Sequence, residues 1–423
     1  MTAAKSGTER IYYLSQQSPM LHFQYSDPEA TLRATELKPK LDHFIEKWME
    51  HVDRELPSEW RMKKDSDKKS NEDEDTAKSA ALNYRIRILN LEGNMTSEPD
   101  RNMPFFGNMG DDTEKKACIK SNGCIEVHIR CYIKDLMSII DDCLPTFFLT
   151  VNFGTRQNKG FGSFVLCNEA GKALFKRQEN EQFLIQWFGK NKVYCIKYRQ
   201  QTSDLEKLSD INTIYQLLKS GINSNGIYLK SYLRDCFAEK NIDWDKKALK
   251  SHSIAPVVYS SPKHAPTPLG PNERFVRGLF GVGDQQQWFS DDGFHNKKIK
   301  GYNKRTGKPI YERETISVKA KSRNIERVPS PLTFKIIGNS VYMFIEEINS
   351  SLPGSWFTFK NESGNTIDLQ IPSSSEYNFN EIMDGFKDRV NSPGVRDVFA
   401  KRPKEQRPIF IQQNCTMEVL GEE

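Results

Sequence analysis

The sequence is poor in the patterns that mark membrane proteins, secreted proteins and several common enzyme classes. Its most apolar run, CLPTFFLTVNFG at 143–154, is shorter than the about 18 residues that a membrane-spanning helix needs. The eight cysteines form no CxxC pair, and the first residues show no basic stretch followed by an apolar run. We therefore expect a reduced, cytoplasmic protein with no membrane partner. Motifs of the HExxH and GxSxG types are also missing, which argues against zinc proteases and serine hydrolases.

Acidic residues are scarce in one stretch of the chain. Residues 297–327 hold eleven Lys and Arg against three Glu, a net charge of +8, whereas all 423 residues together carry only +5. A basic stripe in a nearly neutral protein favours a polyanionic partner at one face, and a solvated charged loop is the alternative. The length predicts two or three domains, and 37% hydrophobic residues suffice for packed cores.

The apolar periodicity of the first half indicates a mixture of strands and helices. Strands are expected at 19–25, 82–91 and 124–133, and helices from an N-cap at Thr35 and at 134–144. The stretch TFFLTVNF that follows the second helix favours a strand by propensity. With a last strand after a glycine-rich loop, the order is close to a split βαββαβ plan.

The second half also mixes strands and helices. A hairpin about Gly338 and Asn339 is expected within 331–348, and an amphipathic helix at 378–390. The proline-rich stretch 251–272 is typical of a linker, and the polar stretch 62–78 of a solvated, mobile insertion. We predict an α+β fold of tandem ferredoxin-like (RRM-like) βαββαβ domains with insertions, one at 1–250 and the other at 251–423.

The loop FGTRQNKGFGSF, residues 153–164, places three glycines around Arg156 and Lys159. Glycine lets the backbone approach a ligand closely, and the cations favour an anion. The spacing of its glycines fits neither a Walker loop nor a dinucleotide fingerprint. The remaining hypotheses from the pattern are an RNA-backbone contact and a tight turn without a ligand.

Two further clusters have both a functional and a structural explanation. The stretch WFGKNKVYCIKYRQ, residues 187–200, interleaves cations with aromatics, which suits single-stranded RNA but equally a strand with a buried aromatic face. Cysteines 118, 124 and 131 with His128 could form a zinc site, but residues three apart on a strand point to opposite faces. We expect structural cysteines, no metal and no cofactor.

The glycine-rich loop resembles that of the RAMP superfamily of CRISPR proteins, the RNA-binding subunits of type III effector complexes. It is most similar to the form in the first subunit of the Cmr (type III-B) module. The stretches LRATELKPKLDHF (32–44) and RVPSPLTFKI (327–336) resemble the first helix start and the second-domain strand entry of that subunit. The resemblance also implies that TFFLTVNF is the end of a helix, in conflict with its strand propensity. The resemblance implies a non-catalytic, RNA-binding subunit that acts in antiviral defence with other effector-complex subunits on guide RNA, target RNA or both.

The resemblance also implies which residues contact RNA. Arg156 and Lys159 would hold phosphates, and the amides around Gly160 and Gly162 would lie against the RNA backbone. The full expected set is Arg33, Lys38, Lys40, Gly154, Arg156, Lys159, Gly160, Phe161 and Gly162.

The rival hypothesis is a RAMP-type endoribonuclease, either metal-independent or using a loop aspartate. Its general base would be His22 or His43, or else Asp111 or Asp112 would act in the turn-rich segment. In guide-processing relatives the glycine-rich loop lies near the C-terminus, whereas here about 260 residues follow it. That position favours the non-catalytic subunit.

Overall fold

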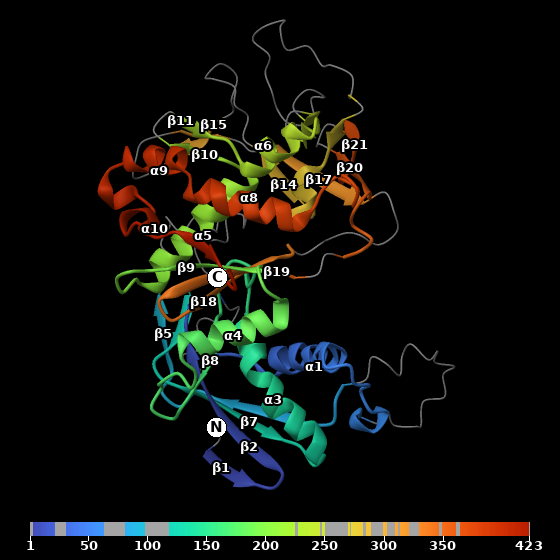
Figure 1. Cartoon of the computed structure of the whole chain (residues 1–423), viewed down its shortest axis with the longest axis vertical. Coiled ribbons are helices and arrows are strands. Elements are labelled where there is room, and N and C mark those ends of the chain that lie inside the picture. Colours follow the sequence, from blue (N-terminus) through green and yellow to red (C-terminus); the bar gives the residue numbers. More distant parts are fainter. Residues whose placement is uncertain are drawn as a thin grey trace, which may run out of the picture. The chain divides into compact units, whose positions relative to one another are not determined.

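The computed structural model describes most of the chain (Figure 1). The described residues are 3–21, 31–62, 81–97, 118–224, 227–245, 248–249, 270, 272–281, 285–288, 299–302, 309–311, 314–320, 330–346, 349–360 and 364–422. They divide into two units. The first comprises Met1–Ile211, Thr333–Phe344 and Gln413–Glu423, and the second comprises Asn212–Leu332 and Ile345–Gln412.

The elements of the first unit come from three parts of the chain. They are β1 (Ala3–Ser6), β2 (Glu9–Gln16), β3 (Met20–Leu21), α1 (Ala34–His51), the 3-10 helix η1 (Ser58–Trp60), β4 (Arg85–Leu89), β5 (Asn94–Ser97), β6 (Cys118–Ser121), β7 (Ile125–Arg130), α3 (Lys134–Thr150), β8 (Phe164–Cys167), α4 (Arg177–Phe188), β9 (Val193–Lys197), β18 (Leu332–Ile337), β19 (Ser340–Ile345) and β22 (Met417–Val419). Helix α5 (Asp204–Lys219) begins in this unit and ends in the second.

The main sheet of the first unit has strand order β1-β2-β7-β4, and β8 also pairs with β2. All of these pairings are antiparallel. Along the chain the elements β2, α1, β4, β7, α3 and β8 therefore follow the strand–helix–strand–strand–helix–strand order that the sequence predicts. Strand β7 alternates as expected, with Ile125, Val127 and Ile129 buried and Glu126 and His128 half-buried.

Helices α1 and α3 accompany this sheet in Figure 1 and share its hydrophobic core. Leu37, Leu41, Phe44 and Ile45 recur at helical spacing on α1 and are all buried, because one stripe of an amphipathic helix packs against the sheet. The sheet contributes its inward face to the same cluster, including Leu14 of β2. The stripe on α1 predicted from the sequence is confirmed.

Three local predictions for this unit are wrong. The first strand of the sheet is β2, upstream of the predicted strand at 19–25, of which Met20–Leu21 forms a short strand in a separate sheet, β3-β6-β5. Helix α1 has Arg33, not Thr35, at its N-cap, because the amides of residues 36 and 37 already bond to the Arg33 carbonyl. Pro39 therefore lies beyond the first turn, where its missing N–H leaves one helical hydrogen bond unmade.

The third error concerns the stretch after residue 144. Helix α3 continues through Pro145 to Thr150, so the strand favoured by propensity is wrong and the helix end implied by the resemblance is confirmed. Every residue from Cys143 to Thr150 is buried. A uniformly apolar stretch has no periodicity that separates a buried helix from a buried strand, and here the packing of the whole helix inside the unit decides.

The hairpin predicted around Gly338 is confirmed, with Gly338 at a φ of +55°. It belongs to the first unit, because β19 pairs with β9 in a sheet of order β18-β19-β9-β22. The two units therefore differ from the expected division at residue 250. A long stretch of sequence lies between β9 and the hairpin, and no local sequence pattern predicts pairing between strands so far apart in the chain.

The second unit has a six-stranded sheet of order β12-β13-β21-β20-β17-β14 and two further strand pairs. Its elements are β10 (Ile222–Ser224), β11 (Ile227–Leu229), α6 (Tyr232–Glu239), β12 (Asp243–Trp244), β13 (Glu273–Arg274), the 3-10 helix η4 (Val276–Phe280), β14 (Gln285–Trp288), β15 (Ile299–Tyr302), β16 (Pro309–Tyr311), β17 (Glu314–Ala320), β20 (Trp356–Lys360), β21 (Thr366–Gln370), α8 (Phe379–Asn391), α9 (Pro393–Ala400), the 3-10 helix η5 (Lys404–Gln406) and α10 (Ile409–Gln412). The helix predicted at 378–390 is α8, with Asn378 as its N-cap and Ile382, Met383, Phe386 and Val390 buried.

The fold class is thus a mixed α+β fold with several small, mainly antiparallel sheets. Several sequence-based predictions lie outside the described residues: the insertion 62–78 from Lys63 onward, the turn-rich segment 101–112, nearly all of the linker 251–272 and most of the basic stretch 297–327. Within the described part of the chain, the helices are too short or too polar to cross a bilayer.

Candidate nucleic-acid interface

The glycine-rich loop connects the end of α3 to the start of β8 and is bound into the unit along its whole length. The amide of Phe153 donates to the Gly162 carbonyl at 3.0 Å, which closes the loop on itself. The amide of Thr155 donates to the Leu21 carbonyl at 3.1 Å. These bonds hold a segment without regular secondary structure in one conformation.

Helix α1 anchors the beginning of the loop. Glu36 Oε1 accepts hydrogen bonds from the Gly154 amide at 2.8 Å and from Lys40 Nζ at 3.0 Å. Lys40 Nζ also donates to the Asn152 carbonyl at 2.7 Å and to Gln157 Oε1. Two residues one helical turn apart thus hold both sides of the loop. Lys40 and Gly154, which both belong to the expected RNA-binding set, share the Glu36 carboxylate as a partner. The Lys40 ammonium, however, already donates hydrogen bonds to Asn152 and Gln157.

The three glycines of the loop have a structural reason for being glycine. Gly154, Gly160 and Gly162 all have φ between +67° and +83°, which L-residues with a side chain rarely adopt. A Cβ at Gly160 would lie 2.7 Å from the Ile211 side chain, and one at Gly162 only 1.9 Å from the Phe153 carbonyl oxygen. The Gly160 and Gly162 amides donate to the carbonyls of Gln157 and Pro19. These amides are therefore occupied within the chain.

The aromatic residues of the loop point inward. Phe153, Phe161 and Phe164 are each fully buried, and Phe153 and Phe164 pack edge to face with ring centroids 5.8 Å apart. Stacking on a base requires an exposed aromatic face. Phe161 therefore contributes to packing and offers no stacking surface, although the resemblance implied that it contacts RNA.

Arg156 and Lys159 are the cations that the loop itself carries, and both are half-buried. Arg156 has a φ of +57°, an uncommon conformation for a residue with a side chain. Burial lowers the pKa of its guanidinium to about 10, so it remains charged near neutral pH. Lys159 forms an isolated bridge with Phe334 of β18, which fixes its backbone.

The other two expected cations of the first helix differ in their surroundings. Lys38 Nζ donates to Asp42 and to the Leu82 carbonyl at 2.9 Å and lies 4.0 Å from the ring centroid of Tyr84. It therefore ties α1 to the strand segment that precedes β4. Arg33, at the N-cap of α1, is exposed.

The aromatic residues of the stretch 187–200 pack against the core and are not available to RNA bases. Tyr194 and Tyr198 are buried, and Trp187 stacks on Trp48 with ring centroids 5.8 Å apart. Lys197 forms ion pairs with Glu181 and Glu418 at 3.5 and 3.3 Å. These aromatic faces are therefore core surfaces.

The residues of the nuclease hypothesis form no constellation within the described part of the chain. His43 lies on the outer face of α1, where its side chain is 67% exposed and its Nδ1 is 3.7 Å from Glu46. His22, Asp111 and Asp112 lie outside the described residues.

The cysteines and His128 of the zinc hypothesis lie apart from one another. His128 contacts Glu126 and Glu9 at 3.1 and 3.6 Å, whereas Cys118 and Cys131 are buried. The sulfur of Cys124 lies 3.6 Å from that of Cys167. Across the described ranges, no three side chains of the metal-binding types gather.

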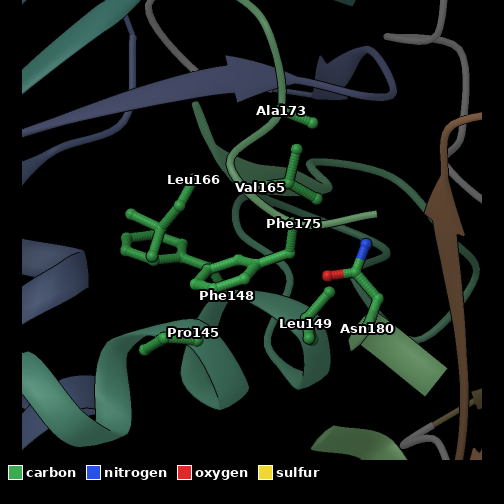
Figure 2. A pocket seen from close by; sticks show the side chains of 8 residues that line it. All are labelled: Pro145, Phe148, Leu149, Val165, Leu166, Ala173, Phe175 and Asn180. Carbon is green, nitrogen blue, oxygen red and sulfur yellow. The ribbon is translucent and has the colours of Figure 1, made fainter. Parts of the chain in front are cut away.

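A small cavity lies where α3, β8 and α4 meet. Figure 2 shows the apolar side chains of Phe148, Leu149 and Val165 around it, with the Asn180 carboxamide at one side. The cavity encloses about 10 Å³, which is enough for one water molecule at most. It is a packing gap beside the loop, too small for a substrate.

Sequence reasoning missed three residues that build the loop. Asn152 donates from Nδ2 to the carbonyls of Gln157 and Phe334 at 2.7 and 2.8 Å, Glu36 holds the Gly154 amide, and Lys335 of β18 donates to the Val151 carbonyl at 2.6 Å. Asn152 stands beside the recognised loop and could have been suspected. Lys335 is separated from it by more than 170 residues, and no spacing signal connects the two.

Comparison with known families covers both halves of the chain. The model of the Cmr1 N-terminal domain matches residues 8–222, and that of the Cmr1 C-terminal domain matches residues 228–400. These matches define a RAMP-superfamily protein of the CRISPR type III class. The chain belongs to the Cmr1 family, the type III-B subunit that the loop resembles, and the resemblance is confirmed.

One solved structure to which the chain is similar is the crystal structure of Cmr1 from Pyrococcus furiosus in its apo form. The two are 10% identical, the match covers 81% of this chain and 89% of that one, and the TM-score is 0.36. No curated protein matches the sequence.

Proposed function

We propose that this protein is a non-catalytic, RNA-binding subunit of a type III-B CRISPR ribonucleoprotein complex in antiviral defence. Its partners would be guide RNA, target RNA or both, and the other effector subunits. The observation that carries the proposal is the way the glycine-rich loop presents Arg156 and Lys159. Membership of the Cmr1 family supports the same conclusion.

The proposal includes the fold that presents the loop. In the strand order β8-β2-β7-β4, helix α1 connects β2 to β4 and helix α3 connects β7 to β8, two pairs of strands that are not neighbours in the sheet. This split arrangement supports a ferredoxin-like first unit. We extend the tandem arrangement to the second unit, whose six-stranded sheet is accompanied by α6 and α8. Two such units give the complex two scaffolds on which loops can meet RNA.

A rigid loop favours phosphate binding for a physical reason. Ordering a flexible cationic side chain on binding costs conformational free energy, and a preorganised backbone lowers this cost. The bonds between Glu36 and the Gly154 amide and between Leu21 and the Thr155 amide fix the backbone before Arg156. The bond from Asn152 Nδ2 to the Gln157 carbonyl fixes it after Arg156. We do not propose RNA contacts for the amides of Gly160 and Gly162, because these amides donate hydrogen bonds within the chain.

The test compares two double variants in titrations of labelled single-stranded RNA at several salt concentrations. Arg156→Gln with Lys159→Gln removes two proposed phosphate contacts, so the slope of log K against log salt should fall by about 1.4, at about 0.7 per contact. The control is Lys134→Gln with Lys172→Gln. Both of these lysines are exposed and lie in the same unit away from the loop, and the control removes the same formal charge.

The control variant should bind RNA with nearly the wild-type slope. Equal slopes for the wild type and the Arg156/Lys159 variant, with both proteins folded by circular dichroism, would mean that the loop is a structural turn and that the proposed interface is wrong.

A further inference from the structure

Lys335 is a buried lysine without an acidic partner. It lies in the middle of β18 among apolar neighbours, and its side chain is 0% exposed. Its ammonium donates to the Val151 carbonyl at 2.6 Å, and among the residues that the structure describes no carboxylate pairs with it. Burying a charge without a counter-charge costs folding free energy.

The surroundings of Lys335 make this charge more costly. Another cation, Lys40, acts on it electrostatically, and burial together with Lys40 holds the pKa of Lys335 well below its usual 10.5. The Oδ1 atom of Asn152, one residue after Val151, is buried without a hydrogen-bond partner. The Val151 carbonyl that accepts from Lys335 stands at the C-cap of α3, where a cation interacts favourably with the end of the helix. This contact offsets part of the cost of the buried charge but supplies no carboxylate to pair with it.

Lys335 lies at the base of the glycine-rich loop. Val151, its acceptor, is two residues before Phe153, where the loop starts. Phe334, the residue before Lys335, donates from its amide to the Asn158 carbonyl at 3.1 Å. Its carbonyl accepts a hydrogen bond from Asn152 Nδ2. Strand β18 thus supports the segment that carries Arg156 and Lys159.

A second buried lysine in the same unit shows the ordinary arrangement. Lys207 of α5 is 2% exposed and donates to the Gly338 carbonyl at 2.8 Å, in the turn that follows β18. It also has an acid, Asp204, at 3.7 Å. The two lysines therefore differ in one respect that matters: Lys207 has a counter-charge in the protein and Lys335 does not.

We propose that Lys335 is a positioning residue of the RNA-binding loop, whose buried charge strengthens the attraction of the loop for an RNA phosphate. This inference rests on the proposed function. An approaching phosphate favours the protonated amine, so phosphate binding and protonation of Lys335 strengthen each other. Two unit charges about 10 Å apart at an effective dielectric constant of about 20 attract each other enough to change affinity on the order of tenfold.

The experiment measures RNA affinity and melting temperature for Lys335→Met, with Lys207→Met as the matched control. Lys335→Met should bind labelled single-stranded RNA about tenfold more weakly at low salt. Its melting temperature measures the balance between removing a costly buried charge and losing the hydrogen bond to the Val151 carbonyl. Lys207→Met should melt lower and bind RNA as the wild type does. A second variant, Lys335→Gln, keeps a hydrogen-bond donor for Val151 and removes only the charge.

Salt dependence separates an electrostatic role from a purely structural one. The affinity difference between the wild type and Lys335→Gln should shrink as salt is raised, because ions screen the exposed phosphate. Wild-type RNA binding with equal affinity in both Lys335 variants would overturn this inference and leave the proposed function standing. Absence of RNA binding by the wild-type protein would overturn the proposed function, and this inference with it.

Discussion

The carboxylate of Glu36 accepts a hydrogen bond from the amide of Gly154 at 2.8 Å, so a side chain on the first helix fixes the backbone at the start of the glycine-rich loop. The same oxygen is 3.0 Å from Lys40 Nζ, which in turn holds the Asn152 carbonyl. Helix α1 therefore determines the loop conformation, although the two segments are more than 100 residues apart in sequence.

Replacing Glu36 by Ala should destabilise the first unit by about 1–3 kcal/mol, because the Gly154 amide and Lys40 both lose their charged partner. Urea denaturation followed by circular dichroism would measure the loss. Glu50→Ala is the matched control on the exposed side of the same helix, and it should change stability by less than about 0.5 kcal/mol. Equal stability of both variants would show that the Glu36 contact is energetically unimportant.

Substitution of Gly162 should be far more damaging than substitution of Gly338, although both have positive φ. Gly338→Ala adds a methyl group in open space and should cost roughly 1–2 kcal/mol from backbone strain alone. Gly162→Ala adds a Cβ that would meet the Phe153 carbonyl oxygen at 1.9 Å, so a loss of about 3 kcal/mol or more is expected. Thermal melts of the two variants give the comparison, and similar melting temperatures would contradict the packing argument.

Gly160→Val should also lower stability, because its side chain would press on Ile211 at a φ of +83°. A loss of RNA binding in this variant would therefore report on folding as well as on backbone approach. The charge-neutralising variants of Arg156 and Lys159 are the cleaner probes of binding, and a Gly160→Val protein with wild-type melting behaviour would show that the loop can relax around the added side chain.

Lys219 predicts how the stability of the second unit depends on pH. Its ammonium donates to the Phe280 and Gly281 carbonyls at 3.0 and 3.2 Å, and burial, with Arg277 nearby, lowers its pKa to about 7. In the unfolded chain the pKa returns to about 10.4. Between these values the unfolded state binds more protons, so this group makes folding more favourable as pH rises from about 7 to about 10.

The measurement is the urea midpoint at several pH values in this window for the wild type and Lys219→Met. The urea midpoint of the wild type should rise with pH in this window by more than that of Lys219→Met. Identical pH dependence in the two proteins would mean that the Lys219 ammonium is not held in the way these contacts indicate.

Purified protein incubated with single-stranded or repeat RNA should leave the RNA intact. His43 is exposed on α1, and among the described residues its ring faces one charged group, Glu46, so it lacks a second group for acid–base chemistry. Denaturing gels provide the measurement. Defined cleavage products that vanish in His43→Ala would favour the nuclease hypothesis instead.

Much of the first unit was predictable because its signals are local. Alternation in 82–91 and 124–133 gave strands, and the stripe from Leu37 onward gave α1, since burial of one face requires these periods. Strand β2 has an apolar run in place of alternation in its sequence, and only its burial alternates, with Tyr12 and Leu14 buried. Periodicity could not give the end of α3 either, because a stretch buried on all sides has no period, and only the family resemblance implied a helix there.

The glycine-rich loop, its cations and the resemblance to the family can be recognised from the order of the residues, because they depend on residue types at fixed spacing. What the residues of the loop do became visible in the folded structure. Folding placed Phe161 in the core, engaged Lys40 with Glu36 and Gln157, and brought Lys335 beneath the loop. Burial and partner choice depend on segments that meet only after folding, and local sequence carries no record of them.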